Sequence, residues 1–224
     1  MGQASESPAV KAFVAKVFGW MSGGLLLTAI VALLTAQSQA ALRVVSQWWI
    51  GLVIAEIVLV VVISWGINRI PATLATGLFV LYAGINGLTL SFIFLAYTSA
   101  SISLTFFVTA GTFGAMALYG YTTKRDLTSW GSLGFMLLIG IIIASIANWF
   151  IASTMLYWII TYVGVFVFVA LTAYDTQKIK SYVSGDGYED AEYVQKAAVV
   201  GALDLYLDFV LLFIYLLRIF GRER

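Results

Sequence analysis

Two aspartates inside a long apolar stretch have the clearest potential for chemistry in this sequence. Asp204 and Asp208 lie within residues 197–220, which are long enough to cross a bilayer as a helix of about 20 apolar residues. A spacing of four places both carboxylates on one helical face, one turn apart. A carboxylate near the centre of a membrane helix costs about 2.5 to 3.5 kcal/mol on insertion scales. We therefore expect this face to point at protein or water and the helix to lie inside a bundle.

Two further acids stand in apolar surroundings. Asp175 ends an apolar run and precedes Lys178, so it could equally be a helix-end acid paired with the lysine at i+3. Glu56 could face a pore, or it could pair with Lys16 or a hydroxyl group. Asp208 lies about twelve residues past the last lysine before it, or roughly 18 Å along a helix. A polar anchor to a buried hydroxyl or amide is the alternative to an ion or proton site there.

Composition decides the class of protein. The chain has 224 residues, of which 62% are hydrophobic and 10% are charged, whereas a soluble domain carries about 25% charge. This favours a single polytopic membrane domain, and a net charge of +1 gives no indication of nucleic-acid binding. Cysteine and histidine are absent, which excludes disulfides, thiol catalysis and histidine ligands for a metal. Any proton sensing must then be done by carboxylates.

We expect an all-α membrane protein with seven transmembrane helices and a central, acidic seventh helix. Residues 1–12 are predicted to be a disordered tail. The predicted spans are about 14–36, 48–67, 73–97, 104–121, 131–151, 155–180 and 197–220. A secretory signal peptide is the alternative for the first span, but that stretch is as long as a span and six more follow. Gly111 and Gly114 are expected to permit close packing of the fourth helix.

Lysine and arginine are unevenly distributed between the two predicted membrane faces. The face that holds the N-terminus carries eight: Lys11, Lys16, Arg69, Lys124, Arg125, Lys178, Lys180 and Lys196. The other carries four: Arg43, Arg218, Arg222 and Arg224. The positive-inside rule then predicts a cytoplasmic N-terminus.

Three motifs occur in order along the chain: LYGYTTKRDLTSWG at 118–131, AYDTQKIK at 173–180 and ALDLYLDF at 202–209. Together with the seven-span layout they resemble the transmembrane Bax inhibitor-1 motif family, in its bacterial branch. The resemblance implies a seventh helix wrapped by the other six, and a calcium leak in the plasma (inner) membrane that responds to pH. It also implies that Asp175 and Asp208 form the proton sensor and that Arg69 latches to them. Asp204 departs from the bacterial pattern and resembles the eukaryotic branch.

The chemistry of the acids is compatible with that implication. Asp175 and Asp208 can meet only if the sixth helix runs on through Lys180 or the seventh begins above the membrane. If they meet, they cannot ionise independently, and the pair titrates in two coupled steps. Calcium prefers oxygen ligands, and Asp208 with Asp175 would bind it weakly and transiently, as conduction requires. Asp204 and Glu56 are secondary candidates on the ion pathway, and we expect no cofactor.

Three classes of function compete. The first is a calcium-permeable leak channel gated by a carboxylate pair between the sixth and seventh helices. The second is a regulatory membrane protein that binds another membrane protein, such as a quality-control protease. The third, an intramembrane enzyme, is not expected, because no serine has an evident base. Tyr174 and Asp175 match one motif of presenilin-type aspartyl proteases, but the Gly-Leu-Gly-Asp motif is missing around Asp208.

Overall fold

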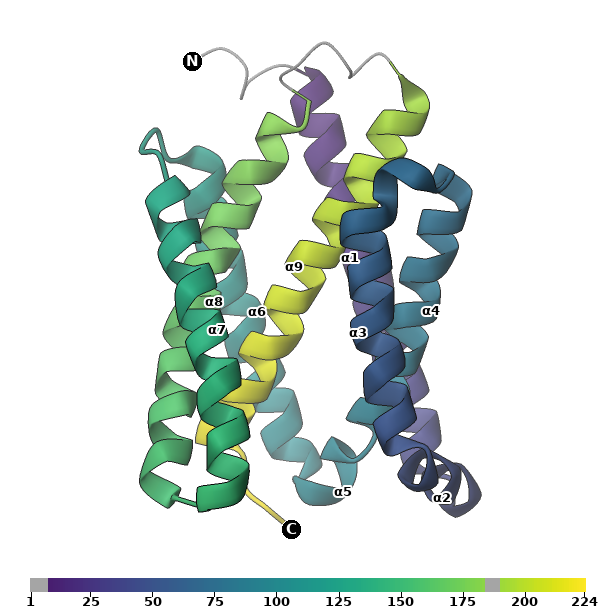
Figure 1. Cartoon of the computed structure of the whole chain (residues 1–224), viewed down its shortest axis with the longest axis vertical. Helices are drawn as coiled ribbons and strands as arrows, with labels where there is room; N and C mark the ends of the chain where they lie inside the picture. Colours follow the sequence, from purple (N-terminus) through teal and green to yellow (C-terminus); the bar gives the residue numbers. More distant parts are fainter. Residues whose placement is uncertain (1–7, 184–189) are drawn as a thin grey trace.

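The computed structural model describes residues 8–183 and 190–224, and helices make up nearly all of them (Figure 1). The helices are α1 (Pro8–Ala36), α2 (Gln39–Gln47), α3 (Trp49–Gly66), α4 (Ala72–Leu90), α5 (Ile93–Ala96), α6 (Ser99–Thr122), α7 (Thr128–Ile151), α8 (Thr154–Ser181) and α9 (Ala191–Phe220), with a short 3-10 helix, η2 (Ile67–Arg69). Seven segments in the described part of the chain are long and apolar enough to cross a membrane. In two of them a short helix prolongs the span: η2 follows α3, and α5 follows α4. The prediction of an all-α membrane protein with seven spanning helices is confirmed.

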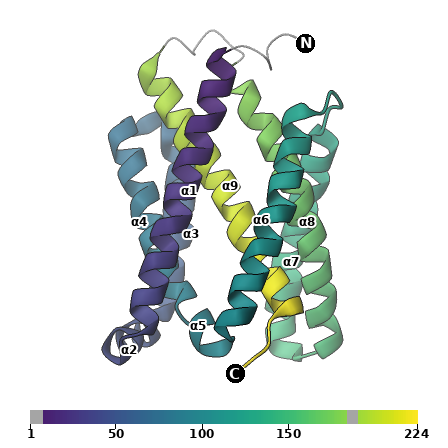
Figure 2. The ribbon, with the colours of Figure 1, turned by 180° about the vertical axis from the view of Figure 1, so that it is seen from behind.

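The most buried helix is α9, which passes diagonally through the middle of the bundle in both views (Figures 1 and 2). Its most apolar stretch is 61% buried, whereas no other span exceeds 39%. It packs against α8, α1, α6, α4 and α3, while α7 packs mainly against α8 on the outside. A helix in this position can carry polar groups that lipid would not tolerate.

The first and the last helix begin before their predicted bounds, whereas the sixth spanning helix matches its predicted range of 155–180 to within one residue. The first helix begins at Pro8, so residues 8–12 of the predicted tail are helical, and residues 1–7 lie outside the described part. The sixth spanning helix continues to Ser181, and the seventh begins at Ala191. The sixth spanning helix therefore runs on past Lys180 and the seventh begins before its apolar stretch, which are the two conditions under which Asp175 and Asp208 could meet. The side chain of Asp190, the N-cap residue of α9, accepts a hydrogen bond from the amide of Glu192 at 2.8 Å. This cap helps α9 to begin before its apolar stretch.

Close helix packing relies on glycines other than those predicted. A Cβ added to Gly111 or Gly114 would meet nothing within 4 Å, so the expectation that these residues permit close packing was wrong. Gly120, at the end of α6, instead lies directly against the backbone of Ala173 in α8. Nearer the start of α8, Gly164 faces the ring of Tyr215 in α9, where an added Cβ would come within 2.7 Å of a ring atom. These contacts hold α8 between α6 and α9 and fix its register.

Candidate functional site

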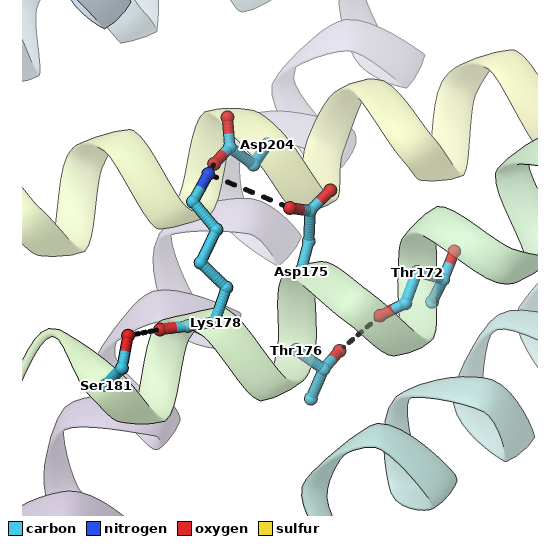
Figure 3. A network of polar contacts seen from close by, with 6 residues as sticks. All are labelled: Thr172, Asp175, Thr176, Lys178, Ser181 and Asp204. Atoms are coloured by element: carbon cyan, nitrogen blue, oxygen red, sulfur yellow. Dashed lines mark hydrogen bonds and ion pairs between the residues drawn. The ribbon is translucent and has the colours of Figure 1, made fainter. Parts of the chain in front are cut away.

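Two carboxylates, Asp175 and Asp204, meet Lys178 where α8 and α9 pack together (Figure 3), and a third, Asp208, lies beside them on α9. The Nζ atom of Lys178 lies 3.1 Å from Oδ2 of Asp204 and 3.8 Å from Oδ1 of Asp175. The side chain of Asp175 is 13% exposed, that of Asp204 21% and that of Lys178 36%. One cation is thus shared by an aspartate from each helix, in a region where few other charges are available. We call Asp175, Lys178, Asp204 and Asp208 the carboxylate cluster.

Asp208 is the buried member of the cluster. The residue is 4% exposed, and its Oδ2 atom receives no hydrogen bond from the described part of the protein. Its carboxyl group lies close enough to that of Asp175 in α8 for the two to interact. A hydrogen bond between two carboxyl groups needs a proton on one of them, because an ionised carboxylate can only accept. The arrangement therefore suits a pair of acids that shares a proton.

Hydroxyl groups near the cluster are already engaged by their own helix (Figure 3). Thr176 donates to the carbonyl oxygen of Thr172 at 2.7 Å, and Ser181 donates to that of Lys178 at 2.6 Å. These bonds leave no threonine or serine proton of this face for the aspartates. The predicted alternative, in which a hydroxyl or amide anchors Asp208, has no support at Oδ2 among the residues described here.

An aromatic ring closes the cluster at the end of α8. The Nζ atom of Lys178 lies 5.9 Å from the centre of the Tyr182 ring. Burial, together with the negative charge of Asp204, raises the pKa of Tyr182 to about 12. Tyr182 follows the last residue of α8, so its phenol can report on the charge of the cluster from outside the span.

The two remaining predicted site residues lie elsewhere. Arg69 is exposed in η2, and no ion pair joins it to an aspartate within residues 8–183 and 190–224. Lys178 is the cation that lies beside the aspartates, where Arg69 was expected. A contact between Arg69 and the aspartates stays a prediction. Oε1 of Glu56 lies 2.8 Å from the hydroxyl of Thr89, within hydrogen-bonding distance, so a hydroxyl is the partner among its three predicted alternatives.

Sequence reasoning paired Lys178 with Asp175 at i+3 but missed its shorter contact with Asp204. The contact depends on the register between α8 and α9, which Gly201 helps to set: a Cβ there would lie 3.0 Å from the side chain of Ile179. No spacing rule along one helix could have supplied that register. The position of Lys178 four residues before Tyr182 was the available signal for the cation–π contact.

The cluster is suited to a passing cation more than to a resident one. Within the described ranges, no group of three or more acidic side chains has the geometry to hold a metal ion. Asp204 is occupied by Lys178, which leaves Asp175 and Asp208 as the closest pair of oxygen donors. Two carboxyl groups without a rigid cage give calcium too few ligands for tight binding, since it takes six to eight oxygens in stable sites.

The chain is similar over nearly its whole length to known bacterial membrane proteins. Residues 10–224 match the family described as "Inhibitor of apoptosis-promoting Bax1". The chain is 51% identical to the Inner membrane protein YbhL of Escherichia coli over 218 residues, which are 96% of this chain and 93% of that protein. It is 46% identical to an uncharacterized protein of Borreliella burgdorferi, with 95% of this chain and 92% of that protein covered. An uncharacterized protein of Deinococcus radiodurans is 40% identical, with 100% and 96% covered.

Proposed function

The chain belongs to the Bax inhibitor-1 family of membrane proteins, and we propose that it is a pH-sensitive, calcium-permeable leak channel of the bacterial inner membrane. A relative named as an inner membrane protein supports the location. The lysine-rich end of the bundle, where α1 begins, would face the cytoplasm by the positive-inside rule. The channel reading rests chiefly on Asp208, a carboxyl group that lies inside the central helix with one oxygen unpartnered.

Charge explains why such a group suits a cation pathway. An acid in a spanning helix is costly, and it is retained where it faces the protein interior or water and serves ions or protons. Asp208 and Asp175 offer oxygen donors deep in the bundle, and a calcium ion that replaced their shared proton would find two negative charges. Weak binding by two carboxylates lets the ion leave again, which a leak requires.

Protonation supplies the gate in this proposal. Lys178 bridges Asp175 of α8 and Asp204 of α9, so the ion pairs join two neighbouring helices at the cluster. Protons that neutralise the aspartates weaken this bridge and also remove the charge that attracts a cation. Either effect couples the packing of α8 on α9 to pH without any histidine.

The test is calcium entry into dye-loaded liposomes that contain the purified protein at pH 7. We expect flux above that of empty liposomes, and a changed flux with Asp208→Asn, which keeps the shape of the side chain and removes its charge. Asp126→Asn is the matched control, because Asp126 is an exposed carboxylate of the loop before α7. Equal flux from the wild-type protein and Asp208→Asn would remove this acid from the pathway.

A regulatory protein that binds another membrane protein is the second candidate. It predicts no flux above empty liposomes from folded protein, and a cellular phenotype that survives Asp208→Asn. Changes in the exposed loop residues 124–126 would then abolish the phenotype. The same two sets of variants thus distinguish the two functions.

A further inference from the structure

A second buried polar network lies on the other side of α9. The hydroxyl of Tyr206 donates to Oδ1 of Asn86 in α4 at 3.0 Å and lies 2.6 Å from the hydroxyl of Thr28 in α1. Thr28 donates to the carbonyl oxygen of Ala83 at 2.8 Å. Tyr206 is fully buried and packs edge-on against the ring of Tyr82, 5.6 Å between centres. Three side chains from two helices, Thr28 of α1 and Tyr82 and Asn86 of α4, therefore converge on Tyr206 of α9.

Glu56 of α3 ends this network. Its Oε1 atom lies 2.8 Å from the hydroxyl of Thr89, and its carboxyl group also lies close enough to the side-chain amide of Asn86 to interact with it. Asn86 can serve both neighbours, since its NH2 group donates to Glu56 while its oxygen accepts from Tyr206. A side-chain path thus runs from Glu56 through Asn86 to the central helix.

Counting protons shows which form of Glu56 fits these contacts. Thr89 has one hydroxyl proton but lies within hydrogen-bonding distance of two acceptors, Glu56 at 2.8 Å and the carbonyl oxygen of Asn86 at 2.9 Å. If Glu56 is ionised, both are acceptors and one contact lacks a proton. If Glu56 is protonated, it donates to Thr89, and Thr89 donates to Asn86. Every contact is then a hydrogen bond.

The charges around Glu56 lead to the same form. The titratable groups that face it are Tyr82 from α4 and Tyr206 from α9, which are both neutral donors. The cations on the elements beside α3 are Arg69 of η2, Arg43 of α2, and Lys196 and Arg218 of α9, and none of them forms an ion pair with Glu56 in the part of the chain described. An ionised carboxylate inside a span without a cation is far more costly than a neutral acid that is hydrogen-bonded.

We propose that Glu56 is a second proton-binding site, a buried neutral acid that donates its proton to Thr89 and is linked through Asn86 to Tyr206 of the central helix. Residues two apart on a helix differ by about 200° in direction, so Tyr206 points away from the face that carries Asp204 and Asp208. The central helix is thus held by a carboxylate cluster on the α8 side and by a protonated glutamate network on the α4 side. This inference does not depend on calcium transport.

Infrared spectroscopy of the protein in lipid bilayers at pH 7 tests the proposal, because only a protonated carboxyl group has a carboxylic-acid C=O stretch. We expect Glu56→Gln to remove one such band, which Asp208→Asn should leave in place. Thr89→Val removes the hydroxyl that accepts the proton of Glu56, so the band should move to higher frequency. Tyr206→Phe should move it by less, through Asn86.

Thr109→Val is the control, since Thr109 is a buried threonine whose hydroxyl bonds only to its own helix, at the carbonyl oxygen of Thr105. It should leave the Glu56 band unmoved. No loss of a carboxylic-acid band with Glu56→Gln would mean that Glu56 is ionised, and the proposal would be overturned. A band that ignores both Thr89→Val and Tyr206→Phe would also overturn it. These two variants decide the matter even if Glu56→Gln does not fold.

Discussion

Replacing Lys178 with glutamine should destabilise the packing of α8 on α9, and the structure sets the scale of the effect. The change leaves Asp175 and Asp204 without the cation that now lies 3.8 Å and 3.1 Å from them. Removing one partner of a buried ion pair costs about 3 to 5 kcal/mol. Because the lysine side chain is 36% exposed, solvent screening reduces the expected loss to about 2 kcal/mol.

A double-mutant cycle separates this interaction from general damage. For a chain of this size, about 2 kcal/mol corresponds to a fall of roughly 4 to 8 °C in the unfolding temperature. Asp204→Asn alone should also destabilise, but the double variant with Lys178→Gln should lose less than the sum of the two, by about 1 kcal/mol or more. Lys124→Gln, a change of an exposed lysine in the loop before α7, should have no measurable effect.

The assay is thermal unfolding of purified protein in detergent, followed by circular dichroism at pH 7 and again at pH 4. The cost of Lys178→Gln should shrink at the lower pH, because protonated aspartates no longer need the lysine. An unchanged unfolding temperature for Lys178→Gln, together with strictly additive effects in the double variant, would refute the shared ion pair.

Three further predictions concern packing and titration. Gly120→Ala should destabilise by about 1 to 3 kcal/mol in the same assay, because its Cβ would collide with the backbone of α8, whereas Gly111→Ala, which meets nothing within 4 Å, should not. The pKa of Tyr182 should fall below about 12 with Asp204→Asn when the phenol is titrated by ultraviolet absorption, while burial keeps it above the ordinary value, and an unchanged value would place the charge elsewhere. The raised pKa of this phenol in the folded state means that its contribution to stability is present below pH of about 10 and is lost as pH rises through the folded value. Asp126 accepts hydrogen bonds from the hydroxyl and amide of Thr128, the first residue of α7, and these bonds lower its pKa. Its contribution to stability is therefore present above pH of about 4 and is lost as pH falls through the folded value. Asp126→Asn should reduce the loss of unfolding temperature on acidification.

Hydropathy and charge were sufficient to predict the architecture. Long apolar stretches in a chain with 10% charge leave few alternatives to spanning helices, because each backbone polar group must be satisfied within the membrane. The presence of acids in the last span also indicated that this helix avoids lipid. The start of α9 was less predictable, since the helix begins at Ala191, among polar residues that precede its apolar stretch and that hydropathy does not count.

The candidate site was predictable in its acids but not in their partners. Asp204 and Asp208 were evident as costly groups one turn apart, whereas the lysine bound to Asp204 comes from 26 residues away. That contact depends on how α8 and α9 lie against each other, which is determined by close approaches such as Gly201 of α9 against Ile179 of α8. Tyr206 lies in an apolar stretch, and its polar neighbours come from two other helices, α1 and α4, so no local pattern marked it as polar.

The pH dependence of calcium flux is the most direct test of a gate formed by Asp175 and Asp208. Flux into dye-loaded liposomes would be followed from pH 5 to pH 8 for the wild-type protein, Asp175→Asn and Asp208→Asn, with Asp126→Asn as the control. We expect that flux through the wild-type protein and the control changes with pH, and that Asp175→Asn and Asp208→Asn each abolish this dependence. A pH profile in Asp175→Asn and Asp208→Asn that matches the wild type would contradict a gate made of these carboxylates.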